Sequence, residues 1–283
     1  MQAIIDYFST IPSLHRTLIL VGGLTFFWVL ESAVPLFRFK YDKWKHAGVN
    51  IFFTLTTIVV NFSLAFVLVK TSDYVVSNRI GLLFLAEMPV WLNMITGILL
   101  MDLIGAYLIH YLEHKVRWMW RFHLVHHTDQ QVDTTSANRH HPGESVFRFV
   151  FTTMAVVLIG APMWMVMMYQ TMSVVLTQFN HSNISMPVWL DKFLGLLFCT
   201  PNIHRIHHHY RQPYTDTNYG NIFSVWDRIF GTYAMVDNHK LVYGLDTYTN
   251  SREVKSIGTI LKMPFMKYRE PVTYDKPENL LEG

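Results

Sequence analysis

Charged residues are scarce in this chain. They make up 15% of its 283 residues, whereas a soluble domain usually carries about 25%. Hydrophobic residues make up 51%, and this balance predicts a protein that is embedded in a membrane. The formal net charge of +3 is too small to indicate a nucleic-acid partner, so we interpret the basic residues as signals of membrane topology.

Cysteine and several cofactor motifs are also missing or nearly so. Cys199 is the only cysteine, which excludes an intrachain disulfide. A glycine-rich dinucleotide fingerprint and a C-x-x-C-H haem motif are absent. The N-terminus lacks the pattern of a signal peptide, so we expect its first apolar run to remain as an anchor. With no internal repeat either, the chain predicts a single membrane-embedded domain over residues 1–283.

Long apolar tracts are plentiful. A spanning helix needs roughly 20 residues to cross the ~30 Å hydrocarbon core, and four tracts meet this length: 17–37, 49–69, 88–112 and 149–180. The fourth is long for one span and short for two, and Gly160-Ala161-Pro162 in its interior would break a helix. The tracts predict an all-α integral membrane fold with about four transmembrane helices, in which the last tract forms a broken hairpin.

The basic residues indicate how these tracts are threaded. If the N-terminus lies outside and the fourth tract enters and returns, the outer segments carry three Lys and Arg residues, and the inner loops before Asn180 carry nine. The remaining 11 follow Asn180. This bias predicts that the C-terminal segment lies on the cytosolic side. Within it, 188–199, 222–230 and 251–267 suit either interfacial helices or ordinary packing helices, and 271–283 suits a loose tail.

Histidine is the residue that stands out. The chain has 15 histidines, and 12 of them lie between His110 and His209. An H-x3-H pair puts two imidazoles on one helical face, the spacing H-x2-HH occurs twice, and one isolated histidine ends the fourth tract. The nine candidate metal ligands are His110, His114, His123, His126, His127, His181, His204, His207 and His208.

Nine imidazoles exceed what one metal ion can take, so we expect two adjacent ions with four or five ring nitrogens each. An ionisable cluster at membrane depth is costly unless it pairs or binds something. The hairpin is required by this interpretation, because a single crossing of tract 149–180 would put His181 and the last trio on the opposite side from the first histidines. The charge distribution and the metal hypothesis therefore predict the same threading.

The ordered set of histidine motifs resembles the fatty acid hydroxylase/sterol desaturase superfamily. Two further segments strengthen the resemblance: Arg139-His-His141-Pro-Gly-Glu144 resembles its R-x-H-P-x-E segment, and 218–232 resembles its N-Y-G…W-D-x-x-F-G-T stretch. The resemblance covers about residues 90–235, which we expect to form the catalytic region. Thr177 occupies a position where the fatty-acid 2-hydroxylase branch has a histidine, so the chain is more similar to the sterol desaturase and alkylglycerol monooxygenase branches.

The resemblance implies a four-helix membrane fold capped by a cytosolic site with two iron ions that activate O2 to hydroxylate or desaturate a C–H bond of a lipid. Zinc suits the same imidazoles, and the spacing alone does not select iron. The substrate would come from the bilayer, and we expect its access route along Trp118, Trp120 and Phe122. A separate ferredoxin or cytochrome b5-like carrier would supply electrons. The implied location is a bacterial inner membrane or the endoplasmic reticulum.

Other polar residues are candidates for orienting the ligands. Asp102 lies two turns before His110 and is a candidate for a hydrogen bond either to a ligand histidine or between helices. The resemblance adds Glu144, Asp216 and Asp227 to these candidates, and His141 could brace the site or bind metal. His140 and His209 extend the motifs, but their neighbours already fill the spacing, so we leave both out.

Three other classes of protein remain as alternatives. A membrane zinc hydrolase would use the same imidazoles, although catalytic zinc usually takes three protein ligands. A haem-binding electron carrier would need histidines one haem apart on spanning helices. A metal transporter would place its ligands along a path across the bilayer, whereas these histidines gather at helix ends.

Overall fold

The computed structural model describes residues 1–272, and all regular secondary structure in that range is helical. The α-helices are α1 (Gln2–Ser9), α2 (Ser13–Ala33), α3 (Lys43–Ser77), α4 (Val90–Asp102), α5 (Ile109–Lys115), α6 (Arg117–His127), α7 (Pro142–Ile159), α8 (Met163–His181), α9 (Val188–Gly195), α10 (Pro201–His207), α11 (Val225–Ile229) and α12 (Ile257–Lys262). A π-helix, η2 (Leu103–Leu108), joins α4 to α5. Short 3₁₀ turns are η1 (Leu82–Phe84), η3 (Thr134–Asn138), η4 (Tyr214–Asp216), η5 (Asn238–Lys240) and η6 (Met263–Phe265). Residues 273–283, most of the predicted loose tail, lie outside the described range.

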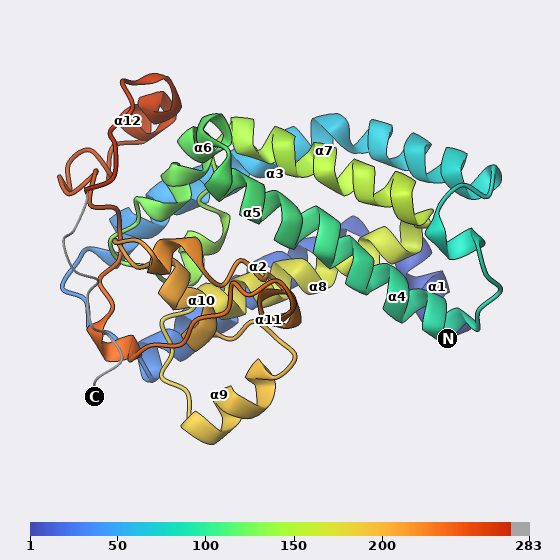
Figure 1. Ribbon diagram of the computed structural model, residues 1–283, viewed down its shortest axis with the longest axis horizontal. Coiled ribbons are helices and arrows are strands. Elements are labelled where there is room, and N and C mark those ends of the chain that lie inside the picture. Colours follow the sequence, from blue (N-terminus) through green and yellow to red (C-terminus); the bar gives the residue numbers. More distant parts are fainter. Residues whose placement is uncertain (273–283) are drawn as a thin grey trace.

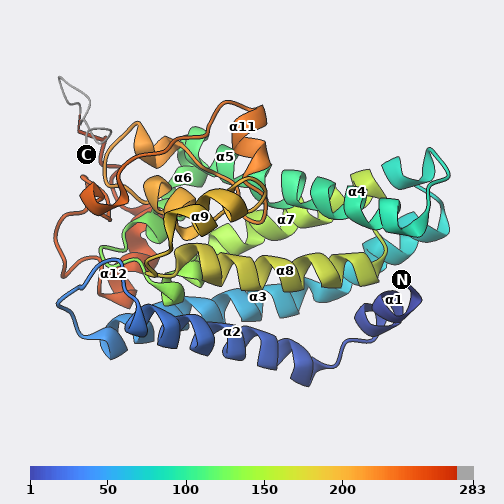
Figure 2. The ribbon, with the colours of Figure 1, turned by 90° about the horizontal axis from the view of Figure 1, so that it is seen from below.

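The long helices lie side by side along the long axis of the molecule (Figure 1). α6, α10 and α12 gather at one end, which we call the histidine end. α1 lies at the opposite end, beside the far ends of α2 and α8 (Figure 2). Four helical segments of the described chain are long and apolar enough to cross a membrane: Ser13–Ala33, Lys43–Phe84, Val90–Lys115 and Pro142–Ile159. The predicted all-helical membrane fold is confirmed.

The predicted hairpin is formed by α7 and α8. α7 starts at the histidine end, earlier than the predicted tract, because Pro142 occupies its first turn and the His141 side chain accepts a hydrogen bond from the Gly143 N–H. It ends at Gly160, which adopts a left-handed conformation with φ 78°, and Pro162 caps the returning helix α8. The chain therefore turns at the residues that were expected to break it, and α8 brings His181 back to the histidine end.

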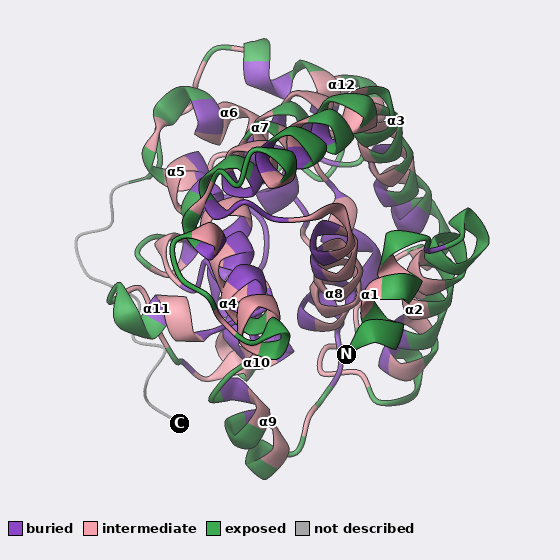
Figure 3. Ribbon diagram, turned by 90° about the vertical axis from the view of Figure 1, so that its right-hand side faces the viewer, coloured by how far each residue is buried: buried purple, intermediate pink, exposed green. Residues whose placement is uncertain are grey.

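α8 is the central helix of the bundle. It contacts α1, α2, α3, α4 and α10, and the end-on view shows buried residues facing inward around it while exposed residues cover the outer helices (Figure 3). Apolar side chains of α3, α4, α7 and α8 form one buried cluster toward the far end. A hydrogen bond from Ser72 Oγ to the Ala161 carbonyl, 2.9 Å long, ties α3 to the hairpin turn. Apolar packing therefore dominates the far end of the bundle, and the buried histidines lie at the histidine end.

The α7–α8 turn leaves no room for a side chain at Gly160. A Cβ atom there would lie 2.4 Å from the Ile80 carbonyl oxygen, and the positive φ is itself strained for other residues. We expect Gly160→Ala to destabilise the protein by about 1–3 kcal/mol, measured as thermal unfolding in detergent. Gly22→Ala in α2 is the matched control, because nothing lies within 4 Å of that position, and alanine is the better helix former. Equal unfolding temperatures for the two variants would contradict the tight turn.

α9 and α11 lie outside the bundle (Figure 1). In α9, Val188, Trp189 and Phe193 are exposed, whereas Asp191 and Gly195 are buried. In α11, the apolar Ile229 is exposed and Asp227 is buried. A short helix that presents aromatic and aliphatic side chains outward next to spanning helices has the character of an interfacial helix.

Candidate metal centre

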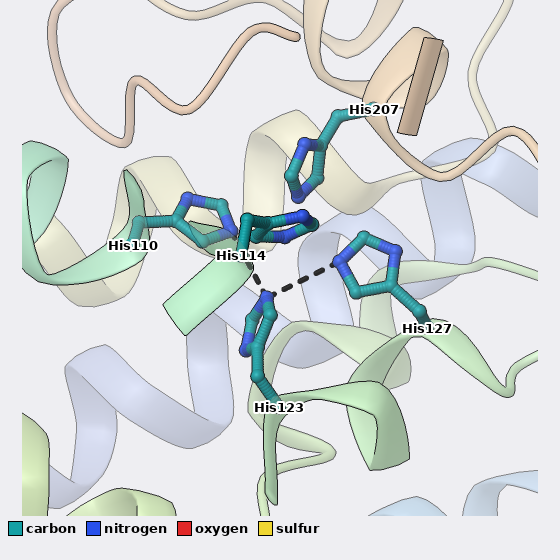
Figure 4. A group of neighbouring side chains, drawn as sticks. All are labelled: His110, His114, His123, His127 and His207. Carbon is teal, nitrogen blue, oxygen red and sulfur yellow. Dashed lines mark hydrogen bonds between the residues drawn. The ribbon is translucent and has the colours of Figure 1, made fainter. Parts of the chain in front are cut away.

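Nine histidines from four elements meet at the histidine end in two groups. Within each group, one ring nitrogen of every histidine lies within 4.8 Å of the corresponding atoms of the others. The five-histidine group contains His110, His114, His123, His127 and His207. The four-histidine group contains His126, His181, His204 and His208. Figure 4 shows the rings of the five-histidine group pointing toward a common centre.

Helical geometry explains how the motifs divide. Residues four apart share a helix face, so His123 and His127 of α6 enter the five-histidine group, while His126, on another face, enters the four-histidine group. At α10 the division is reversed, because His204 and His208 share the four-histidine group and His207 enters the other. Each H-x2-HH trio therefore contributes to both groups. Just before His110, the π-helix η2 adds a residue to one turn and so rotates α5, which carries His110 and His114.

The contacts between ring nitrogens are those of a metal-binding site. His110 Nδ1 lies 2.8 Å from the Tyr219 carbonyl oxygen, and His123 Nδ1 lies 2.8 Å from Glu144 Oε1. A carbonyl oxygen and the oxygen of an ionised carboxylate can only accept hydrogen bonds. Each Nδ1 therefore carries the proton, and each Nε2 carries a lone pair. The two Nε2 atoms lie 3.1 Å apart. Two lone pairs at this distance repel each other unless a cation lies beside them.

The four-histidine group has the same feature. His181 Nδ1 donates toward the Thr177 carbonyl oxygen at 2.9 Å, which leaves its Nε2 as a lone pair. This Nε2 lies 3.1–3.2 Å from the Nε2 atoms of the other three histidines, His126, His204 and His208. In the five-histidine group, the Nε2 atoms of His114 and His207 are buried without a hydrogen-bond partner among the described residues. Each group can hold a metal ion, and its residues fit iron or zinc.

Burial favours the neutral, metal-binding form of six of these histidines. Burial lowers the pKa of His123 to about 3, and burial together with the neighbouring imidazoles holds the pKa of His126, His127, His204, His207 and His208 well below its usual value. A metal ion therefore need not displace protons from these rings near neutral pH.

Glu144 is the main carboxylate behind the ligands. Its side chain is fully buried, and Oε1 lies 2.8 Å from Nδ1 of His123, 2.8 Å from Nδ1 of His140 and 2.9 Å from Nε of Arg148. Arg148 also donates to Glu113 at 2.6 Å. A carboxylate that accepts from the far nitrogen of a ligand histidine orients the ring and raises its basicity, and the contact with His123 allows Glu144 to act in this way.

We expect Glu144→Gln to lower metal affinity by about tenfold. Glutamine keeps an acceptor oxygen toward His123 but loses the charge that pairs with Arg148. The measurement is competition with a calibrated chelator during metal removal. Glu253→Gln, which alters a partly exposed pair with Arg269 outside the site, is the control. Equal metal retention in both variants would exclude this role of Glu144.

His140 and Asp216 complete the surroundings of the ligands. His140 was left out of the predicted site, yet its ring stacks on His126 with centroids 4.5 Å apart, and with His123 and Glu144 it forms a third potential metal-binding group. Asp216 Oδ1 lies 3.2 Å from His114 Nδ1. Burial alone would raise the pKa of Asp216, but His114 and Lys115 hold it below its usual value.

The other predicted supporting residues lie farther from the ligands. Asp102 accepts hydrogen bonds from the backbone N–H groups of Ile222 and Phe223 and from the indole of Trp226, so its partners in the structure are not histidines. Asp227 accepts from the N–H groups of Tyr219 and Gly220, and it thereby holds the turn whose carbonyl faces His110. Burial raises the pKa of Asp227 to about 6. His141 caps α7 and belongs to neither histidine group.

A second polar network, which the sequence did not indicate, braces the loop after α6. His46, expected to be an ordinary residue, is buried with Nε2 2.8 Å from Asp129 Oδ1. The fully buried Arg139 donates to Asn50, to Thr128 and to the backbone carbonyls of Val125 and Val254. Asp129 follows His127 by two residues, so this network fixes the end of α6 against α3.

A cavity of about 760 Å³ leads from the bundle to the histidines. It is lined by α2, α3, α7 and α8 and reaches His110, His126, His181 and His204. Ile58 and Phe62 of α3 line it and are exposed, so it reaches the outer surface of the bundle there. Trp118, Trp120 and Phe122, the predicted access route, are not among its lining residues. α6 lies at the end of the bundle, whereas the cavity runs between the spanning helices.

Comparison with known proteins agrees with this site. Residues 94–232 match the family model described as fatty acid hydroxylase. This match and the relatives below agree with the resemblance predicted from the histidine motifs. No solved structure matches the chain.

The relatives are lipid hydroxylases and monooxygenases by name. The chain is 26% identical over 196 residues to the ornithine lipid hydroxylase OlsE of Rhizobium tropici, covering 69% of this chain and 57% of the relative. It is 30% identical to alkylglycerol monooxygenase of Danio rerio, covering 58% and 35%, and 28% identical to a cholesterol 25-hydroxylase-like protein of Danio rerio, covering 50% of each. The matched region thus spans little more than half of these relatives at most.

Proposed function

We propose that this protein is an O2-dependent di-iron oxidoreductase that hydroxylates a C–H bond of a membrane lipid. Desaturation of the lipid is the alternative reaction. The observation that supports the proposal most strongly is the position of the two histidine groups at the inner end of a cavity that runs between membrane-spanning helices. The names of the relatives favour hydroxylation.

The residues of the site indicate what the bound iron and the protein would each contribute to the reaction. Bound iron would supply O2 activation and removal of hydrogen from the substrate carbon. The nine imidazoles hold the ions, Glu144 and Asp216 orient two of the ligand rings, and the apolar bundle holds the lipid and excludes water. Hydroxylation consumes one O2, two electrons and two protons per C–H bond and releases one water. The electrons would come from a ferredoxin or a cytochrome b5-like carrier.

The inner end of the cavity indicates how a lipid would lie. Arg148, Ser145 and Thr152 line the wall next to the histidines, and 28% of the Arg148 side chain is exposed. Farther along α8 the lining includes Met163 and Met167. A lipid with its polar group beside the histidines would contact the polar wall there. Its chain would then extend toward the far end and pack against the apolar side chains. We therefore place the reacting carbon close to the polar group of the lipid.

We place the histidine end on the cytosolic side of the membrane. The threading of the bundle puts the loops that carry nine Lys and Arg residues, together with the C-terminal segment, at this end, whereas the far-end segments carry three. Reporter fusions at the N-terminus and in the loop before α4 test this orientation.

The metal content tests the function first. Protein is purified anaerobically from cells grown with iron-57, and metal content is measured together with Mössbauer spectra. About two irons per chain as a coupled pair supports the proposal, and membrane lipids are then screened for uptake of one atom from ¹⁸O2. Zinc alone, unchanged by iron loading and without O2-dependent lipid oxidation, contradicts the proposal and favours a zinc hydrolase. A haem absorption band would favour an electron carrier.

A further inference from the structure

The two histidine groups have different surroundings. Three members of the four-histidine group, His126, His181 and His204, line the cavity. In the five-histidine group only His110 does so. Three of its other members, His114, His123 and His127, instead contact Trp120 of α6, which does not line the cavity. The centre therefore has a cavity side and a Trp120 side.

Trp120 packs against three members of the five-histidine group. Its centroid lies 4.8 Å from that of His114, 5.4 Å from that of His127 and 6.1 Å from that of His123. Trp120 itself is partly exposed, whereas the His114 side chain has no exposed surface. An aromatic side chain in contact with three buried histidines and with solvent forms a packed connection between the protein surface and this group.

The surface around Trp120 is basic. Arg117 lies over the Tyr268 ring and pairs with Glu270, Arg121 donates to the carbonyls of Pro264 and Met266, and Arg269 pairs with Glu253. Among the described residues, this surface carries the basic side chains Lys115, Arg117, Arg121, Lys267 and Arg269 and the carboxylates Asp216, Glu253 and Glu270. Arg117 is 64% exposed at its side chain. A basic surface of this kind attracts an acidic partner and accelerates its association.

We propose that this basic surface around Trp120 is the docking site of an acidic one-electron carrier protein, and that Trp120 conducts the electrons to the five-histidine group. The inference rests on the proposed function, since an oxygenase reaction needs two electrons that the lipid does not supply. The carrier is oxidised twice per turnover, one electron at a time, and the iron-loaded protein is reduced. Substrate then reaches the centre from the cavity side and electrons reach it from the other.

The test is the rate of electron uptake, followed by stopped-flow absorbance of the carrier. A reduced plant-type ferredoxin and a reduced cytochrome b5 soluble domain serve as acidic carriers for the iron-loaded protein in nanodiscs. Arg117→Glu combined with Lys267→Glu is expected to slow bimolecular electron transfer about tenfold at low ionic strength, with the difference disappearing in high salt. Trp120→Leu is expected to slow it in both conditions.

Three controls keep the outcomes distinguishable. Lys45→Glu reverses an 87%-exposed charge at the same end of the bundle, outside the surface around Trp120, and should leave the rate unchanged. Dithionite should reduce all variants equally, and iron content should match the wild type, which excludes loss of the centre. Unchanged rates for Trp120→Leu, or equal slowing by Lys45→Glu, would overturn the inference. A wild type that accepts electrons yet oxidises no lipid would instead contradict the proposed function.

Discussion

Replacing His181 with alanine is expected to remove the metal of the four-histidine group and to lower lipid oxidation by more than about a hundredfold. His181 Nε2 lies within 3.2 Å of the Nε2 atoms of all three other members of this group. It is supplied by the end of α8, whereas the other members come from α6 and α10. Without it, three imidazoles remain for an ion that four would hold, so the affinity of this group for metal falls.

The readout for His181→Ala is metal per chain, since loss of activity alone would not separate the two groups. We expect the content to fall from about two ions toward one, with the five-histidine group still occupied. His15→Ala, at an exposed histidine beside Tyr7 near the far end, is the control. Full metal content in His181→Ala would show that this histidine is not a ligand, and complete loss of metal would show that the two groups bind as one unit.

The histidine motifs were predictable from the sequence because their geometry is local. Spacings of three and four residues on a helix place imidazoles on fixed faces whatever the rest of the chain does. The hairpin was predictable for a related reason, since Gly160 and Pro162 act on their own helix turn. The argument that His181 must return to the other histidines then needed only the direction of the tracts.

The residues that support the ligands could not be predicted in this way, because their partners come from distant parts of the chain. Asp102 accepts hydrogen bonds from two backbone N–H groups that follow it by 120 and 121 residues in the sequence. His140 precedes the helix that His141 caps, and its side chain reaches Glu144 only because of the way this turn is oriented. His46 has a carboxylate partner 83 residues away. Such contacts depend on how the helices pack, and no short motif encodes them.

The cavity also could not be predicted from the sequence. Its wall consists of one stripe from each of several helices, and the stripe on α8 mixes apolar and polar side chains without a recognisable pattern. The aromatic run in α6 suggested an access route because Trp and Phe are common at membrane interfaces. The structure instead assigns Trp120 to the opposite side of the centre, where it covers ligand histidines.

Shortening the cavity is expected to change which lipids are oxidised. Ala65 lines the cavity on α3, eight residues beyond Thr57 toward the far end, a distance of about 12 Å along the helix. We expect Ala65→Trp to lower oxidation of long-chain lipids by about a hundredfold, the range over which apolar pockets discriminate by size. Short-chain analogues should lose far less, because their chains end before this position.

The comparison needs a variant that also introduces tryptophan, but on the outer face of the helix. Val59→Trp provides it, since Val59 is exposed and does not line the cavity. The quantity to measure is the ratio of long-chain to short-chain oxidation, with iron content checked in both proteins. A ratio that falls only in Ala65→Trp means that the chain of the substrate lies along α3 with its polar group at the histidines. Unchanged oxidation of both chain lengths in Ala65→Trp would mean that this part of the cavity does not hold the chain and that the lipid reaches the histidines from another direction.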